Sequence, residues 1–350
     1  MKSDKKIYTI KDIAQKACVS SATVSNALNN KGRLNIATKQ KILNISKMLG
    51  YEPNIVAKAL SMKKSKVIGV FITDITNEYY AQVLEGIEDL ANKNGYIVVL
   101  VNTHNDLKKE QKEVETLTRL FTEGLIFISG LSKFKHIIDS NSGAIPIVCI
   151  DREVEEKIVI PSVLINNTDA MVQAVNYLYK MGHREIGYFG SMIEKKDLVI
   201  KKRYEGYQKG IEMLGLNISQ TNIFNHNLSQ QMNISDIYKT FTNYIKNNLK
   251  RINATALISQ NDNLAIALMQ ALKDCGIRVP EEISVMGFDN IFMAQFVNPP
   301  LTTTEQPKKE LGKVGVQLLL DIINNKRIDN KVRYLKTNII ERKSVIALKK

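Results

Sequence analysis

The sequence predicts a small all-α unit of the helix-turn-helix type, followed by an α/β body of two Rossmann-like lobes. Three observations predict this organisation: helical spacing of apolar residues over 9–50, alternation of β-rich runs with amphipathic helices from residue 67, and a repeat of that alternation after residue 185. With 350 residues, of which 44% are hydrophobic, the chain has enough apolar material for ordinary cores. A disordered chain and a disulfide-stapled miniprotein are therefore excluded.

The net charge is concentrated at the N-terminus. The chain carries 49 Lys and Arg against 35 Asp and Glu, a net charge of +14. Residues 1–66 contain 14 of the basic residues and 3 of the acidic ones, so this segment carries +11 and the other 284 residues carry +3. An excess of this size indicates an anionic partner, nucleic acid or a membrane surface, at the N-terminal unit.

The compartment follows from the cysteines and from the absence of apolar runs. Cys18, Cys149 and Cys275 are odd in number and widely spaced, which is typical of a reducing compartment. Residues 1–10 are charged and lack the apolar stretch of a secretory signal, and no apolar run approaches the roughly 18 residues of a membrane span. We therefore expect a soluble, cytoplasmic protein with no membrane partner.

The first two helices are predicted close together. Thr9 can cap a helix, with Asp12 three residues later in a capping-box arrangement, and Ser20 can cap a second helix. The inward faces are formed by Ile10, Ile13, Ala14 and Ala17 in the first helix and by Val24, Ala27 and Leu28 in the second. The second helix has an outward face of Ser21, Ala22, Ser25, Asn26 and Asn29. Since only Cys18 and Val19 separate the helices, the pair is predicted to be a helix-turn-helix.

A third helix is predicted from near Asn35 to Gly50, with Pro53 beyond it. A generic three-helix bundle with a solvated polar face would show the same pattern. DNA binding is favoured because the outward face of the second helix is small and polar, the segment carries +11, and it precedes a separate globular body.

In the body, short apolar runs alternate with amphipathic helices, which predicts parallel sheets. Strands are expected at 67–72, 97–101, 124–128, 145–150, 163–165, 185–189, 254–259 and 283–288. Helical crossovers are expected at 80–94 and 108–122. Ligands of such sheets bind beyond the strand C-termini, where the polar residues Asp74, Asp151, Asn166, Asn261, Asp262, Asp289 and Asn290 follow the apolar runs.

Enzymatic function is not indicated. The sequence has no Gly-x-Ser-x-Gly elbow, no phosphate-binding Gly-rich loop and no His-Glu-x-x-His, and its four histidines, His104, His136, His183 and His226, are scattered. We expect no catalytic residues, no cofactor and no metal.

Two blocks of the N-terminal segment, Thr9–Asn29 and Leu49–Leu60, resemble the DNA-binding headpiece of the LacI/GalR (lactose-repressor/galactose-repressor) family in order and spacing. The body is similar to the effector domain of that family, itself similar to periplasmic sugar-binding proteins, in Val279–Asp289 and Pro300–Pro307 among other stretches. The resemblance implies a headpiece at 8–52, a hinge helix and linker at 53–66, and an effector-binding and dimerisation domain at 67–345. Its N-lobe is expected at about 67–165 and 294–326, and its C-lobe at about 166–293 and 327–345.

The resemblance also implies how DNA is bound. Ser21, Ala22 and Asn26 would lie nearest the bases in the major groove, where Asn26 replaces the Arg of many members and can pair with adenine. The implied phosphate contacts are Thr9, Ser20, Thr23, Ser25 and Asn29. In the hinge, which begins near Asn54, Leu60 would wedge between base pairs of the minor groove with Lys58 beside it. A linker residue packed on the headpiece is the alternative for Leu60.

For the effector, the resemblance implies that Tyr79 or Tyr80 walls the ligand. Asp151, Arg203, Asn261 and Asp289 would hydrogen-bond it, and Asp74, Asn166 and Asp262 are further candidates. This chemistry suits a polyol. Asn166 replaces an Asp of purine-binding relatives, which disfavours a purine, and Lys195, Lys196, Lys201 and Lys202 leave room for a sugar acid or sugar phosphate. The alternatives are strand-end caps for the acidic residues and a solvated surface for the lysines.

Taken together, these features predict a sequence-specific transcriptional regulator, in the first place a repressor of carbohydrate metabolism genes. It would act as a homodimer on a pseudo-palindromic double-stranded operator and respond to a sugar-like effector bound between the lobes. Two alternatives stay open: a cytoplasmic sugar sensor that binds DNA only nonspecifically, and a regulator that requires a corepressor.

Overall fold

In the computed structural model the chain divides into two units, Met1–Ser65 and Lys66–Lys350. The structure describes residues 8–28, 32, 34–51, 65–120, 122–141, 145–155, 159–190, 197–224 and 234–348. Four residues predicted to bind DNA, Asn29, Asn54, Lys58 and Leu60, lie outside these ranges. We call residues 8–51 the headpiece and residues 65–348 the body.

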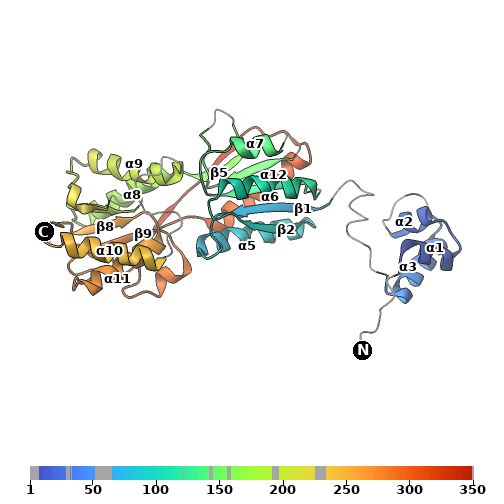
Figure 1. The fold of residues 1–350 in the computed structure, drawn as a ribbon, viewed down its shortest axis with the longest axis horizontal. Helices are drawn as coiled ribbons and strands as arrows, with labels where there is room; N and C mark the ends of the chain where they lie inside the picture. The colour runs from blue at the N-terminus through green and yellow to red at the C-terminus, as the bar shows by residue number, and fades with distance from the viewer. Residues whose placement is uncertain are drawn as a thin grey trace. The chain divides into compact units, whose positions relative to one another are not determined.

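The headpiece consists of α1 (Ile10–Ala17), α2 (Ser21–Leu28) and α3 (Ile36–Leu49), as shown in Figure 1. The expected capping box forms, because the Asp12 carboxylate accepts hydrogen bonds from the Thr9 N–H (2.7 Å) and hydroxyl (2.6 Å). Ser20 Oγ accepts from the Thr23 N–H at 3.1 Å at the start of α2. α3 ends at Gly50, whose φ of 61° is the left-handed conformation that glycine adopts without strain.

A small apolar core joins the three helices. Ile13, Val24 and Ile42, one from each helix, are fully buried. Partly buried residues complete the core: Ile10, Val19, Leu28, Leu34, Ile45, Leu49 and Tyr51. The inward faces of α1 and α2 are therefore the ones predicted from helical spacing.

The body contains two six-stranded sheets (Figure 1). The first has the order β11-β5-β4-β3-β1-β2 and the second has the order β12-β10-β9-β8-β6-β7. The first comprises β1 (Val67–Ile72), β2 (Ile97–Asn102), β3 (Gly124–Ile128), β4 (Ile147–Ile150), β5 (Ser162–Ile165) and β11 (Val332–Leu335). The second comprises β6 (Ile186–Phe189), β7 (Ile223–Phe224), β8 (Ala256–Ser259), β9 (Ser284–Asp289), β10 (Thr302–Glu305) and β12 (Asn338–Ile340). Neighbouring strands are parallel except β10 and β12, which confirms the predicted fold class.

Helices cover both sheets (Figure 1). The first lobe carries α5 (Glu78–Lys93), α6 (Leu107–Arg119), α7 (Lys135–Asn141) and α12 (Lys308–Ile323). The second carries α8 (Asn167–Lys180), α9 (Leu198–Met213), α10 (Ile234–Asn248) and α11 (Asp262–Asp274), with short 3₁₀ turns η1 (Gln220–Asn222) and η2 (Phe292–Gln295). α12 packs against α5 and α8 packs against α9. Among the described residues, no helix is both long and apolar enough to cross a membrane.

The chain crosses between the lobes three times, and two crossings correct the expected lobe boundaries. The first crossing follows β5, as expected from the boundary at 165–166. The second was expected near residue 294, but β10 pairs in parallel with β9, so the chain leaves the second lobe only after Glu305. The return was expected near 327, but β11 pairs with β5 of the first sheet, so the chain returns only after Leu335.

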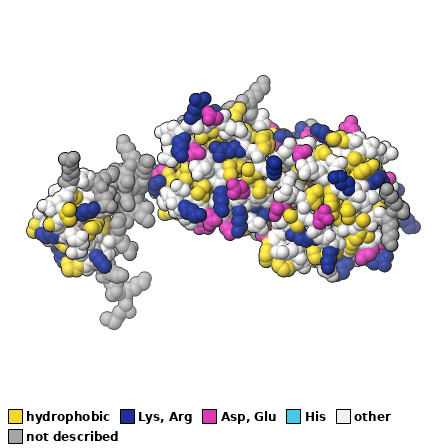
Figure 2. All heavy atoms as spheres, turned by 180° about the vertical axis from the view of Figure 1, so that it is seen from behind, with side chains coloured by type: hydrophobic (Ala, Val, Ile, Leu, Met, Phe, Trp, Pro, Cys, Tyr) yellow, Lys and Arg dark blue, Asp and Glu magenta, His cyan; other side chains and the backbone are white. Residues whose placement is uncertain are grey.

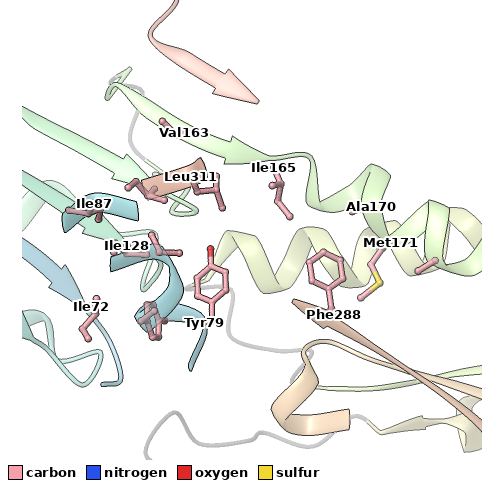
Figure 3. Packing of buried hydrophobic residues seen from close by; sticks show 14 of the residues in the cluster. Ile72, Tyr79, Ile87, Ile128, Val163, Ile165, Ala170, Met171, Phe288 and Leu311 are labelled. Atoms are coloured by element: carbon pink, nitrogen blue, oxygen red, sulfur yellow. The ribbon is translucent and has the colours of Figure 1, made fainter. Parts of the chain in front are cut away.

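One apolar cluster continues across the junction of the lobes (Figure 3). Ile128 and Leu311 contribute from the first lobe, and Met171 and Phe288 contribute from the second. Tyr79, at the start of α5, lies in the same cluster. Aromatic rings are thus placed where the carboxyl ends of the two sheets meet.

Basic and acidic side chains are mixed on the face of the body shown in Figure 2. This agrees with the net charge of only +3 for the residues after 66. By contrast, the described headpiece carries Lys11, Lys16, Lys39, Lys41 and Lys47 with a single carboxylate, Asp12.

Candidate functional sites

The outer face of α2 is a candidate nucleic-acid interface. Ser21, Ala22 and Asn26 are exposed on it, while Ser25 is partly exposed. The implied phosphate contacts Thr9 and Ser20 are also exposed, and Thr23 is partly exposed with its Oγ1 2.8 Å from Ser20 Oγ. Among the described residues of α2, Asn26 is the only exposed side chain with an amide, which allows two hydrogen bonds to one base edge.

A polar cavity of about 100 Å³, which we call the lobe cavity, lies between the lobes. Six of the predicted effector residues line it: Tyr79, Tyr80, Asp151, Arg203, Asn261 and Asp289. It is also lined by residues that the sequence did not single out: Asn77, Ser129, Asp197, Val199, Ile200, Gln260 and Gln306. Strand ends and helix starts from both lobes therefore converge on one site, as open α/β sheets predict.

Arg203 on α9 organises the lobe cavity. Its side chain is buried, with Nε donating to Asn167 Oδ1 (2.8 Å) and Nη1 donating to the main-chain oxygen of Gln260 (2.8 Å). Nη1 also lies 3.5 Å from Asp289 Oδ1, and Nη2 reaches across the lobes to 3.9 Å from Asp151 Oδ2. Burial alone would lower the pKa of Arg203, but Asp289 and Asp151 raise it, so the guanidinium stays charged.

Asp151 follows β4 in the first lobe. The Tyr79 hydroxyl donates to its Oδ2 at 2.9 Å, and the Ser129 hydroxyl lies 3.5 Å from the same atom. Its Oδ1 is buried and meets no hydrogen-bond partner at normal geometry among the described residues, although the Asn167 side chain lies near enough to the carboxylate to oppose the rise of its pKa. Burial raises the pKa of Asp151 to about 6, against the opposing effect of Arg203. One carboxylate oxygen is thus left as an open acceptor.

Asp289 ends β9 in the second lobe. Gln306 donates from Nε2 to Asp289 Oδ1 at 2.7 Å, while Gln306 Oε1 is buried without a partner. The Lys308 ammonium donates to the main-chain oxygens of Asp289 and, at 2.9 Å, of Asn290. Burial raises the pKa of Asp289 to about 6, with Arg203 opposing the shift. Gln306 belongs to the second crossing between the lobes, so it could not be found from the strand pattern.

Strained backbone accompanies these strand ends. Ser129, Asp151 and Asp289 have φ values of 53°, 45° and 120°, in the region where residues with a Cβ are uncommon. Such conformations persist only where the surrounding contacts fix them, and they cluster at functional sites. All three of these residues line the lobe cavity.

Three predicted effector residues do not line the lobe cavity. Asp74 is exposed and holds its own turn, accepting from the N–H (2.9 Å) and hydroxyl (2.7 Å) of Thr76. Asn166 is exposed and caps α8 through the Asp169 N–H. Asp262 is fully buried and accepts from the Ile291 N–H (2.8 Å) and the Thr303 hydroxyl (2.6 Å).

Asp262 lies outside the lobe cavity and holds the loop that follows the cavity residue Asp289. It packs over Gly287, where a Cβ would come within 2.1 Å of Asp262 Oδ1, so only glycine leaves room for the carboxylate. Its bonds to residues 291 and 303 fix the loop that follows Asp289. Asp262 is therefore a positioning residue rather than a wall of the lobe cavity, which corrects its expected role.

Asp197 lines the lobe cavity and was not among the predicted site residues, although its position in the sequence could have indicated it. It caps α9, accepting from the N–H groups of Val199 (2.9 Å) and Ile200 (3.3 Å), and Arg203 lies on that same helix. An Asp at a helix N-cap six residues before Arg203 could have been placed near it. Burial raises the pKa of Asp197 to about 6.

Comparison with known proteins identifies the class and the family. Residues 9–54 match bacterial regulatory proteins of the lacI family, and residues 175–345 match the periplasmic binding protein-like domain. The HTH-type transcriptional regulator RegA of Clostridium acetobutylicum is 37% identical over 337 residues, which are 96% of this chain and 98% of RegA.

Two solved structures agree in fold. The lac repressor dimer bound to operator and the anti-inducer ONPF aligns with a TM-score of 0.84 at 24% identity, covering 98% of this chain and 100% of that chain. A LacI family transcriptional regulator from Enterococcus faecium with bound ribose aligns with a TM-score of 0.69 at 26% identity, covering 81% and 100%.

A helix-turn-helix headpiece and a two-lobed, periplasmic-binding-protein-like body together define a class of DNA-binding transcriptional regulators. The chain belongs to the lacI family of bacterial regulatory proteins. It is therefore a DNA-binding regulator of transcription and not an enzyme.

Proposed function

We propose that this regulator is a cytoplasmic repressor that binds a pseudo-palindromic operator as a homodimer and is controlled by a small sugar-like effector in the lobe cavity. The observation that carries the proposal is the reach of Arg203 from the second lobe to Asp151 of the first, beside Asp289. Support comes from two relatives, one a repressor dimer bound to operator and the other a regulator with bound ribose.

The lobe cavity favours a polyol of small size. Carboxylate and amide oxygens can accept from hydroxyls, and the aromatic ring of Tyr79 or Tyr80 can cover an apolar sugar face. A volume of about 100 Å³ lies below the roughly 300 Å³ at which drug-sized pockets begin. A cavity of this size favours a ligand of one sugar ring over a larger one.

Effector binding would act through the contacts that join the lobes. Besides Arg203 and Asp151, the Leu198 N–H of the second lobe donates to Ser132 Oγ of the first at 2.7 Å. The Glu78 carboxylate on α5 accepts from the N–H groups of Phe292 and Met293 in the second lobe. A ligand that binds one lobe arrangement more tightly shifts the population toward it. In this proposal the hinge segments 53–66 of the two chains of the dimer transmit that shift to the operator.

The headpiece part is tested by Asn26→Ala, which should lower operator affinity about 10- to 100-fold, since one bidentate base contact contributes roughly 1–3 kcal/mol. Binding to random DNA should change little. Fluorescence anisotropy against palindromes from the protein's own promoter region measures both, and the stoichiometry should be two chains per palindrome. Asn44→Ala is the matched control, because Asn44 is an exposed asparagine on α3.

Three outcomes distinguish the alternatives. A steep salt dependence without preference over random DNA would support the nonspecific sugar sensor instead. Release of the operator on adding a sugar supports an inducer-controlled repressor, whereas tighter binding supports the regulator that requires a corepressor. Equal losses in the Asn26 and Asn44 variants would contradict the assignment of α2 as the base-reading helix.

A further inference from the structure

We propose that the lobe cavity selects an uncharged or cationic polyol, such as a neutral sugar or an amino sugar, and rejects sugar acids and sugar phosphates, with Asp197 as a specificity-determining residue. The inference rests on the proposed function, because it assumes that the effector binds in this cavity. It narrows the three effector classes that the sequence left open.

The charge of the cavity wall is the first observation. Three carboxylates, Asp151, Asp197 and Asp289, line the cavity, and Arg203 is the single cationic side chain among its described lining residues. Lys308 lies behind Asp289, but its ammonium donates to main-chain oxygens of residues 289, 290 and 306. An anionic ligand would meet more negative than positive charge on these lining residues, of which Asp151, Arg203 and Asp289 are buried, and this disfavours its binding.

The balance of hydrogen-bond donors and acceptors is the second observation. Arg203 already directs Nε to Asn167 and Nη1 to Gln260, and the Tyr79 hydroxyl donates to Asp151. Two buried acceptors of the cavity wall, Asp151 Oδ1 and Gln306 Oε1, have no hydrogen bond to a described residue, and they belong to residues only 2% and 1% exposed. A ligand that donates hydrogen bonds would satisfy both acceptors. Hydroxyls and ammonium groups donate, whereas an ionised carboxylate only accepts.

Two of the four lysines that suggested an acidic effector, Lys201 and Lys202, do not line the cavity. Lys201 lies 3.5 Å from Glu205, and Lys202 forms an ion pair with Glu153. Each of these ammonium groups therefore has a carboxylate partner. Lys195 and Lys196 lie outside the described residues.

Asp197 is the carboxylate that can be changed with the least damage. Its structural role is to cap α9, and Asn caps helices as well as Asp does. Asp106 provides a matched control, because it caps α6 through the same pair of contacts, to the N–H groups of Lys108 (2.8 Å) and Lys109 (3.2 Å). Asp106 is not a lining residue of the lobe cavity.

The test compares the full chain with Asp197→Asn and Asp106→Asn at pH 7 by isothermal titration. The probes are sets built on one carbon skeleton, for example glucose, glucosamine, gluconate and glucose 6-phosphate, with the corresponding pentose set. We expect the wild type to bind a neutral or amino member at least about tenfold more tightly than the acid and phosphate of its set. Asp197→Asn should reduce that ratio severalfold, and Asp106→Asn should leave it unchanged.

Two results would overturn this inference: tighter binding of an acid or phosphate to the wild type, or the same selectivity ratio in both variants. In either case the proposed effector site stands. If no member of any set binds, the sugar effector of the proposed function is contradicted instead.

Discussion

Replacing Arg203 with Met is expected to abolish effector binding and to lower the free energy of unfolding of the body by about 3–5 kcal/mol. The methionine keeps an apolar stem over the Phe288 ring, above which the guanidinium lies at 4.0 Å. It removes the positive charge between Asp151 and Asp289, and these buried carboxylates then repel each other without compensation. Urea denaturation measures the loss of stability, and isothermal titration with a sugar that binds the wild type measures the loss of affinity.

The control is the triple variant Arg203→Met, Asp151→Asn, Asp289→Asn, in which no unpaired charge is left. It should recover most of the stability and none of the effector affinity. A single Arg203→Met variant with the urea midpoint of the wild type would show that the guanidinium does not hold the two carboxylates together.

Asp151→Asn, in contrast, is expected to raise the free energy of unfolding at pH 7 by about 1–3 kcal/mol while weakening effector binding. Burial raises the pKa of Asp151 from 3.8 to about 6 in the folded protein, although Arg203 opposes the shift. Folding therefore favours the protonated carboxyl, so its stabilising contribution is complete below about pH 4 and is lost as the pH rises through about 6. An amide does not titrate and keeps the Tyr79 hydroxyl as a donor.

The measurement is urea denaturation of wild type and Asp151→Asn at several pH values between 4 and 8. The advantage of the variant should be largest near pH 7 and should shrink toward pH 4. Asp74→Asn serves as the exposed control and should show no such trend. A constant difference between wild type and Asp151→Asn over the whole range would mean that ionisation of Asp151 does not oppose folding.

The parts predicted well from the sequence are those fixed by local contacts. The Thr9–Asp12 capping box, the Ser20 cap and the glycine that ends α3 are all decided within a few residues. The central strands were also predicted, because their side chains are buried on both faces and read as apolar runs. β10 was missed because Thr302, Thr303 and Thr304 are buried but polar, so the run lacks the expected signal.

The candidate site was predicted only in part, for a related reason. Asp151, Asn261 and Asp289 follow strands that end at one edge of a sheet, and this rule needs no tertiary contacts. The same rule failed for Asp74, whose carboxylate is used by its own turn. Gln306 could not be predicted from the sequence, because its position in the cavity depends on where the chain crosses between the lobes.

The three crossings also determine when each sheet can be completed during synthesis and how a lobe can be transferred to a related protein. Each lobe is discontinuous: β11 completes the first sheet and β12 completes the second, although both come from the last part of the chain. During synthesis on the ribosome, the first sheet is incomplete until Leu335 has emerged and the second until Ile340 has emerged, whereas the headpiece is synthesised first. A chimera that transfers one intact lobe to a relative therefore needs three separate junctions, at residues 165–167, 305–308 and 335–338, rather than one.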